Sequence, residues 1–215
     1  MSWPALAGRR EHAWRAAVLA ACFVALYAAA VVTPWGQSAD AQLFGLLMGA
    51  GLVDPAVADV VRGALVGCAA LVAVAVGVVA CCRGRWSAAV ATAAVTLCSA
   101  VLSLVLRDVV LLRPFHDADY AYAHNTFPST HVTVTTALAV AVVVLWPYRG
   151  VHGRVVVREA ALAVVVVACL VNVLSFAHRP ADVLGSVLLV GVVTSAAGAV
   201  RPSWVDEAQP RYSAS

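Results

Sequence analysis

Reactive side chains are concentrated in two short stretches of a chain that otherwise consists mostly of Ala, Val and Leu. The first stretch, residues 107–131, reads RDVVLLRPFHDADYAYAHNTFPSTH and contains two Arg, three Asp and three His. The second, residues 178–182, reads HRPAD. Arg side chains and the backbone N–H groups of a helix start are common ligands of phosphate in proteins. The two stretches therefore predict a phosphate-handling site.

A helix is expected to begin at the sequence Pro128-Ser129-Thr130-His131. The first N–H groups of a helix have no partner inside it, so these groups and the hydroxyls of Ser129 and Thr130 form an end that can bind an anion. Arg113 lies in the preceding loop, where its guanidinium group could hold two phosphate oxygens at once.

His178 and Asp182 are four residues apart at the expected start of the last helix. This spacing places both side chains on one helix face, within hydrogen-bond distance. A carboxylate in that position fixes the tautomer of the imidazole and raises its basicity. A His that is oriented in this way beside an anion site is an arrangement suited to nucleophilic attack.

The elements that position these residues are expected to be membrane helices. Of the 215 residues, 63% are hydrophobic and 12% are charged, and the mean hydropathy is +0.91. A soluble domain of this length could not present such a composition to water. We therefore expect an all-α, polytopic membrane protein.

Six apolar runs are candidates for spans of roughly 17 to 25 residues. They are Ala16–Val32, Val57–Ala80, Ala88–Leu106, Val132–Trp146, Ala160–Ala177 and Val183–Val200. A seventh apolar segment, Ala41–Leu52, is too short to cross and is interpreted as an interfacial or re-entrant helix. The prediction is one domain over residues 1–215, with a core at about 16–200 and tails at 1–15 and 201–215.

Residues typical of helix ends support these boundaries. Asp54 before Pro55 predicts a capped helix start, and Ser87 is a candidate cap for the third span. Trp146-Pro147 is expected to end the fourth span.

The distribution of Arg predicts the orientation. Ten of the 14 basic residues fall on one side of the predicted spans. They are Arg9, Arg10, Arg15, Arg83, Arg85, Arg149, Arg154, Arg158, Arg201 and Arg211. The positive-inside rule assigns this side to the cytoplasm. We expect both termini in the cytoplasm, and the polar stretches on the extracytoplasmic face of a bacterial inner (plasma) membrane.

The N-terminus admits a second interpretation. Arg9-Arg10, an apolar run and Ala28-Ala29-Ala30 resemble a secretory signal with a small-residue cleavage site. The run is longer than a usual signal core, which favours a retained anchor.

The remaining polar residues of the first stretch are ambiguous, because a solvated loop contains polar side chains in any case. They are Asp108, His116, Asp117, Asp119 and His124. A metal site formed by the last four is conceivable, but no helical spacing supports it. We expect no metal and no other cofactor.

The order of three motifs resembles the signature of the type-2 phosphatidic acid phosphatase superfamily, membrane lipid phosphatases related to vanadium haloperoxidases. The motifs are Arg113-Pro114, Pro128-Ser129-Thr130-His131 and His178-x-x-x-Asp182. They cover about the second half of the chain, and the six-helix plan covers the whole. The resemblance implies that His178 attacks phosphorus to form a phosphohistidine, that Asp182 orients it and that His131 protonates the leaving oxygen. It assigns phosphate binding to Arg113 and Ser129, with Thr130 beside them.

Three positions differ from the family pattern, which has Lys at position 106, Gly at 130 and Arg at 172; here they are Leu106, Thr130 and Asn172. A phosphoryl group in transfer needs positive charge around its oxygens. We expect Arg107 and Arg179 to supply it. For Arg179, contact with lipid headgroups is an equal alternative.

The leading hypothesis is a phosphatase that hydrolyses a phosphomonoester or diphosphate of a polyprenyl lipid or glycerolipid at the extracytoplasmic face. A catalytically impaired relative that binds lipid phosphate or a membrane partner is the alternative. A transporter is a third, less favoured class, because no acidic residue falls at the middle of a span. The expected partners are the lipid substrate and membrane lipids, with no nucleic acid.

Overall fold

The structure, a computed structural model, describes residues 3–114, 125–148 and 150–200. Every regular element in these ranges is helical. The elements are α1 (Trp3–Leu26), η1 (Tyr27–Val32), α2 (Pro34–Gly49), α3 (Pro55–Cys82), α4 (Trp86–Val105), η2 (Leu106–Val110), α5 (Thr130–Leu145), α6 (Val151–Leu174) and α7 (Pro180–Val200), where η1 and η2 are π-helices. The predicted all-α class is confirmed for this part of the chain.

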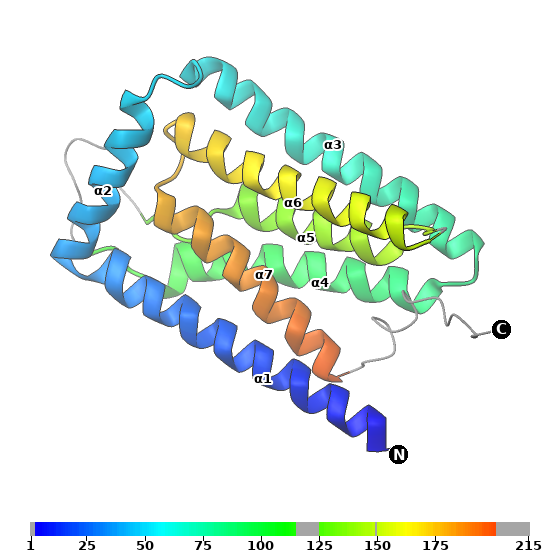
Figure 1. Cartoon of the computed structure of the whole chain (residues 1–215). Coiled ribbons are helices and arrows are strands. Elements are labelled where there is room, and N and C mark those ends of the chain that lie inside the picture. Colours follow the sequence, from blue (N-terminus) through cyan, green and yellow to red (C-terminus); the bar gives the residue numbers. More distant parts are fainter. Residues whose placement is uncertain (1–2, 115–124, 149, 201–215) are drawn as a thin grey trace.

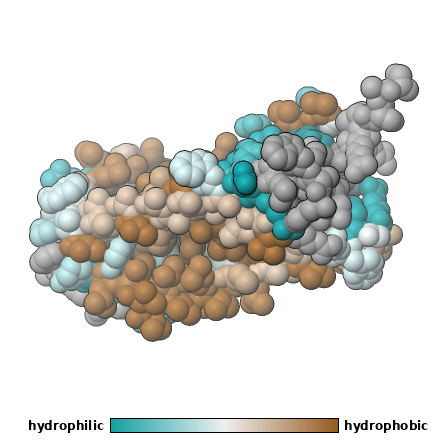
Figure 2. Space-filling model, turned by 90° about the horizontal axis from the view of Figure 1, so that it is seen from below, coloured by the Kyte–Doolittle hydropathy of each residue, from teal (hydrophilic) through white to brown (hydrophobic). Residues whose placement is uncertain are grey.

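Five helical stretches are long and apolar enough to cross a membrane. They are Gly8–Val32, Pro55–Cys82, Trp86–Val110, Val151–Leu174 and Pro180–Val200. Figure 2 shows a face on which hydrophobic residues predominate, with the most hydrophilic residues gathered toward the right of the view. These features indicate a multi-pass membrane protein. The fourth predicted span corresponds to α5, which at 16 residues is shorter than the other five.

The largest difference from the predicted boundaries is in α1, which begins at Trp3, 13 residues before the predicted Ala16 and within the predicted tail. The boundaries of α6 differ as well. This helix begins at Val151 rather than Ala160 and ends at Leu174 rather than Ala177. A count of apolar residues stops at Arg158 and Glu159, but both are good helix formers and lie exposed on the surface of α6. The helix ends early because Phe176 adopts a left-handed conformation with φ of 56°.

Two of the three predicted helix ends are confirmed. The Asp54 carboxylate accepts hydrogen bonds from the N–H groups of Ala56 at 2.8 Å and Val57 at 3.4 Å. Helix α5 ends at Leu145, immediately before Trp146. Ser87 is not a cap, because α4 already begins at Trp86.

Helix α2 crosses one end of the bundle and connects α1 to α3 (Figure 1). It spans Pro34–Gly49, so it starts seven residues before the predicted Ala41 and ends three before Leu52. The start is set by Thr33, whose hydroxyl accepts a hydrogen bond from the N–H of Gly36 at 3.1 Å. A side chain at Gly36 would collide with the carbonyl of Ala29, so glycine is required for the close approach of α2 to η1.

Helix α5 packs against α3, α4, α6 and α7, and α1 runs antiparallel to α7 (Figure 1). This topology brings the end of α4, the start of α5, the end of α6 and the start of α7 to the same end of the bundle as α2. The two polar stretches of the sequence therefore meet there.

Candidate active site

The candidate site is organised around Asp182, whose side chain is fully buried near the start of α7. Its Oδ1 accepts a hydrogen bond from Nη2 of Arg113 at 2.6 Å. Its Oδ2 accepts hydrogen bonds from the hydroxyl of Thr126 at 2.6 Å and the backbone N–H of Arg179 at 3.1 Å, and lies 3.5 Å from Nδ1 of His178. One carboxylate thus connects both polar stretches of the chain.

His178 does not lie in the last helix, as its spacing to Asp182 suggested, because α7 begins at Pro180. It lies in the connection after α6, where its backbone N–H donates to the carbonyl of Asn172 at 3.1 Å. The imidazole is buried, with 7% of the residue exposed, and its Nδ1 faces Asp182. The His–Asp pair therefore forms through a turn of the connection, and Nε2 is left as the nitrogen available for reaction.

The start of α5 is attached directly to the start of α7. Ser129 caps α5 by accepting a hydrogen bond from the N–H of Val132 at 3.4 Å, and its own N–H donates to the carbonyl of Asp182 at 3.3 Å. The hydroxyl of Ser186 approaches the carbonyl oxygens of Ser129 and Asp182 at 2.9 and 2.8 Å. Ser129 is therefore held beside Asp182, as the prediction of a shared site requires.

The ring of Phe127 fixes the segment that leads into α5. It is fully buried and lies 5.2 Å from the ring of Phe23 and 5.6 Å from that of Tyr27, measured between centroids. On α7 it packs on Gly185, where any side chain would collide with the ring. Replacement of Gly185 would therefore displace Phe127 and the residues that follow it.

His131 stands at the open side of the site. It is exposed in the first turn of α5, and the charged groups that act on it are Arg62 and Asp59 of α3, Arg107 and His178. The structure thus places His131 within the electrostatic field of His178.

Arg107 reaches the start of α5 from η2. Its Nη1 donates to the hydroxyl of Thr130 at 3.2 Å, and the hydroxyl of Ser103 lies 3.3 Å from the same oxygen. Its Nε and Nη2 hold the carboxylate of Asp108 at 2.7 and 3.0 Å. Arg107 is therefore directed toward the start of α5, where we expect it to supply the positive charge that Leu106 lacks.

Two Arg residues whose side chain or backbone hydrogen-bonds to Asp182 are buried. Arg113 is 8% exposed and Arg179 is 4% exposed. Such burial does not fit the alternative in which Arg179 lies among lipid headgroups at the surface. Nε of Arg113 is buried and has no hydrogen-bond partner among the described residues. A buried N–H group without a partner is costly, so this atom is a ready donor for an anionic ligand.

The sequence did not single out Asn125, Thr126 or Asp40. Asn125 and Thr126 lie inside the first polar stretch, so their position was a usable signal. The side-chain amide of Asn125 donates to the carbonyls of Arg107, Leu111 and Phe127 at 3.0 to 3.2 Å, which ties η2 to the segment before α5. Asp40 carried no such signal, because it lies in an apolar segment far from both stretches.

Helix α2 holds the segment that contains His178 at two points. The Asp40 carboxylate accepts a hydrogen bond from the N–H of Ala181 at 2.9 Å, and the ring of Phe44 packs edge-on against Phe176 with centroids 5.6 Å apart. Residues 40 and 44 are one turn apart on the buried face of α2. Together they hold residues 176–181 at both ends, with His178 between them.

Burial raises the pKa of Asp40 from 3.8 to about 6, with a further rise from the charge of Asp182, and the hydrogen bond from Ala181 opposes the rise. The folded state therefore binds the proton of Asp40 more tightly than the unfolded state does. The contribution of Asp40 to stability is present at low pH and is lost as the pH rises from about 4 to about 6. The difference amounts to roughly 3 kcal/mol. Asp40→Asn keeps an oxygen acceptor for Ala181 and should remove this loss. Thermal unfolding in detergent at several pH values measures the effect.

The matched control for Asp40→Asn is Asp59→Asn, because the Asp59 side chain is 58% exposed on α3. It should leave the pH dependence of the melting temperature unchanged. An Asp40→Asn protein whose melting temperature follows the same pH profile as the parent would contradict the assignment.

Four candidate metal ligands lie outside the described residues: His116, Asp117, Asp119 and His124. Within the described ranges, no group of three or more His, Cys, Asp or Glu side chains is arranged to hold a metal ion.

No protein-family profile matches the chain, and no curated protein or solved structure resembles it significantly.

Proposed function

We propose that the protein is a membrane phosphatase of the type-2 phosphatidic acid phosphatase superfamily that hydrolyses a lipid phosphate through a phosphohistidine. The observation that carries this proposal is the arrangement of His178 and Arg113 on the same buried carboxylate. Asp182 orients the imidazole, and the Nε–H group of Arg113 is a hydrogen-bond donor without a partner among the described residues. Nucleophile and phosphate ligand are thus positioned by one residue.

In the proposed reaction, Nε2 of His178 attacks phosphorus and the bond from phosphorus to the lipid oxygen breaks. His131 donates a proton to that oxygen, so the lipid leaves as an alcohol, or as a monophosphate if the substrate is a diphosphate. Water then attacks the phosphohistidine, His131 accepts its proton, and inorganic phosphate is released. Asp182 stabilises the positive charge of His178 during both steps.

One departure from the family pattern contacts the residue that we expect to compensate for another, which supports the proposal. Thr130 stands where the family has Gly, and its hydroxyl accepts a hydrogen bond from Arg107, the nearest cation to the usual Lys position. A side chain at 130 thus directs a guanidinium group toward the α5 start. We infer that Arg107 and the buried Arg179 supply positive charge to the phosphate.

We further propose that α5 is a sixth span and that α2 lies in the outer interface. Most of the Arg residues that the structure describes lie toward the end of the bundle opposite to α2, for example Arg9, Arg15, Arg83 and Arg154. The positive-inside rule puts that end in the cytoplasm and the site on the extracytoplasmic face.

A vesicle assay tests both the activity and its sidedness. Right-side-out membrane vesicles that contain the protein should release inorganic phosphate into the outer medium from polyprenyl phosphate, polyprenyl diphosphate or phosphatidate. Inside-out vesicles should do so only after permeabilisation, and vanadate should inhibit by mimicking five-coordinate phosphorus. No release from any lipid phosphate in detergent would refute the phosphatase assignment, and release only from intact inside-out vesicles would reverse the orientation.

One observation favours a catalytically impaired relative that binds lipid phosphate. Asn172, where the family has Arg, is buried, and its amide donates to the carbonyl of Ala168 at 2.7 Å within α6. It brings no charge to the site. Under this alternative the purified protein binds vanadate or lipid phosphate, seen by a rise in melting temperature, but releases no phosphate.

A further inference from the structure

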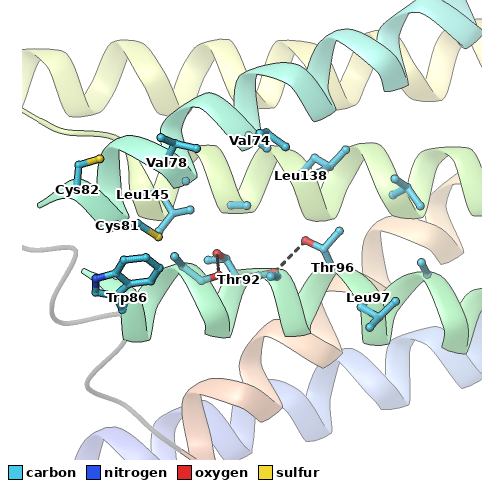
Figure 3. A pocket seen from close by; sticks show the side chains of 17 residues that line it. Val74, Val78, Cys81, Cys82, Trp86, Thr92, Thr96, Leu97, Leu138 and Leu145 are labelled. Atoms are coloured by element: carbon cyan, nitrogen blue, oxygen red, sulfur yellow. Dashed lines mark hydrogen bonds between the residues drawn. The ribbon is translucent and has the colours of Figure 1, made fainter. Parts of the chain in front are cut away.

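An apolar groove of about 780 Å³ runs along the bundle between α3 and α4, with α5 as its floor (Figure 3). Val74 and Val78 line it from α3, Trp86 and Leu97 from α4, and Leu138 from α5. The volume lies within the range of ligand-binding cavities, roughly 300 to 1,000 Å³.

The polar groups in the wall of the groove are already satisfied. The Thr92 hydroxyl lies 3.0 Å from the carbonyl oxygens of both Ala88 and Ala89. The Thr96 hydroxyl donates to the carbonyl of Thr92 at 2.9 Å (Figure 3). The wall therefore has few free hydrogen-bonding groups for a ligand. Its occupant must be an apolar chain, because a polar group would lose its hydrogen bonds to water there.

The groove leads to the His131 side of the candidate site. Val134, which lines it, is three residues after His131 on α5, a rise of about 4.5 Å. Ala100, at its outer end on α4, is one turn before Ser103, which contacts Thr130. The apolar channel and the start of α5 are thus nearly continuous.

The chemistry of phosphoryl transfer accounts for the position of the groove on the His131 side of the site. The attacking and leaving atoms lie roughly in line on opposite sides of phosphorus. If His178 attacks from the α7 side, the leaving oxygen and the lipid attached to it point away from α7. The groove lies on that side, between α3 and α4, and His131 of α5 is three residues before Val134 in its wall.

We propose that the α3–α4 groove holds the hydrocarbon chain of the substrate and that the substrate is a phosphorylated lipid with one long, polyprenyl-type chain. This inference rests on the proposed phosphatase function. Between Ala100 and Trp86 the groove follows 14 residues of α4, or about 21 Å. One leaflet contributes only about 15 Å of hydrocarbon. A chain that fills the groove therefore reaches beyond the middle of the membrane.

A second apolar cavity, of about 390 Å³, lies on the other side of α5, between α3 and α6. Its outermost α5 residue, Ala139, is eight residues from His131, and its volume is half as large. It provides a matched control for the groove.

Ala93→Phe places a ring in the groove, and Ala161→Phe places one in the second cavity. The two purified variants are compared with the parent on a long polyprenyl phosphate and on geranyl phosphate, whose chain is too short to fill the groove. Ala93→Phe should raise KM for the long substrate about tenfold, which corresponds to about 1.4 kcal/mol of lost binding free energy. It should change KM for geranyl phosphate by no more than roughly twofold. Ala161→Phe should change neither. Equal effects on both substrates, or an effect of Ala161→Phe alone, would overturn the proposal.

A binding measurement separates failure of the groove from failure of the phosphatase assignment. A polyprenyl phosphate with a photoreactive group near the end of its chain should label residues 86–105 of α4, and unlabelled polyprenyl phosphate should compete. Such labelling in a protein that releases no phosphate would support the groove and refute only the enzyme. Labelling confined to α6, or labelling that resists competition, would overturn the groove even in an active protein.

Discussion

His178→Ala is expected to abolish phosphate release, with a loss of at least about a thousandfold, because no other group replaces an attacking nucleophile. The variant should also lose the acid-labile phosphate that brief exposure to radiolabelled lipid phosphate leaves on the parent protein. The side chain is buried against Asp182, so melting temperature should be measured in parallel to separate lost chemistry from lost folding.

Two His variants complete this experiment. His131→Ala should slow turnover about a hundredfold with a lipid substrate, as expected for loss of a general acid, and much less with p-nitrophenyl phosphate, whose leaving group needs no proton. His152→Ala, at an exposed position at the start of α6, should behave as the parent does. Near-normal phosphate release by the His178 variant would place the active site elsewhere in the protein.

Asp182→Asn is expected to have the largest effect on stability. It leaves the guanidinium of Arg113 buried without its counter-charge, and removal of one partner of a buried ion pair costs about 3 to 5 kcal/mol. Turnover should also be lost, since the imidazole of His178 would no longer face a carboxylate. The free energy of unfolding in mixed micelles, or the melting temperature where unfolding is irreversible, measures the first effect.

A double variant isolates the ion pair from the rest of the site. Arg113→Met combined with Asp182→Asn removes both charges and should recover part of the lost stability but no activity. Asp59→Asn breaks the exposed pair with Arg62 on α3 and should cost less than about 1 kcal/mol. If Asp182→Asn were as stable as Asp59→Asn, the Arg113–Asp182 contact would not be an ion pair that stabilises the fold.

The caps show how far local sequence determines structure. Asp54 and Trp146 marked helix ends correctly because such signals act within one turn of the chain. Ser87 is not a cap because α4 begins at Trp86, two residues before the predicted Ala88, and its N-cap residue Arg85 makes no side-chain cap hydrogen bond. The length of α6 was underestimated because Arg158 and Glu159 interrupt hydrophobicity without interrupting a helix.

The candidate site was readable from sequence only where its residues carry charge or lie within a polar stretch. His178, Asp182 and Arg113 stood out against an apolar background, and the structure brings all three together. The backbone path that brings His178 to Asp182 could not be predicted from the sequence. His178 meets Asp182 from a connection outside the helix, since Phe176 ends α6 with a positive φ and the chain turns before Pro180.

The sequence alone determined a helical chain of membrane composition with its reactive residues at two helix junctions, because hydrophobicity and charge are properties of residues. Only tertiary structure decided which junctions meet and which residues from other elements join them. Asp182 pairs with Arg113 across 69 positions, and Asp40 reaches Ala181 across 141. Such contacts have no local signal, because they depend on how α2, α5 and α7 pack and on the rule that a buried charge needs a partner.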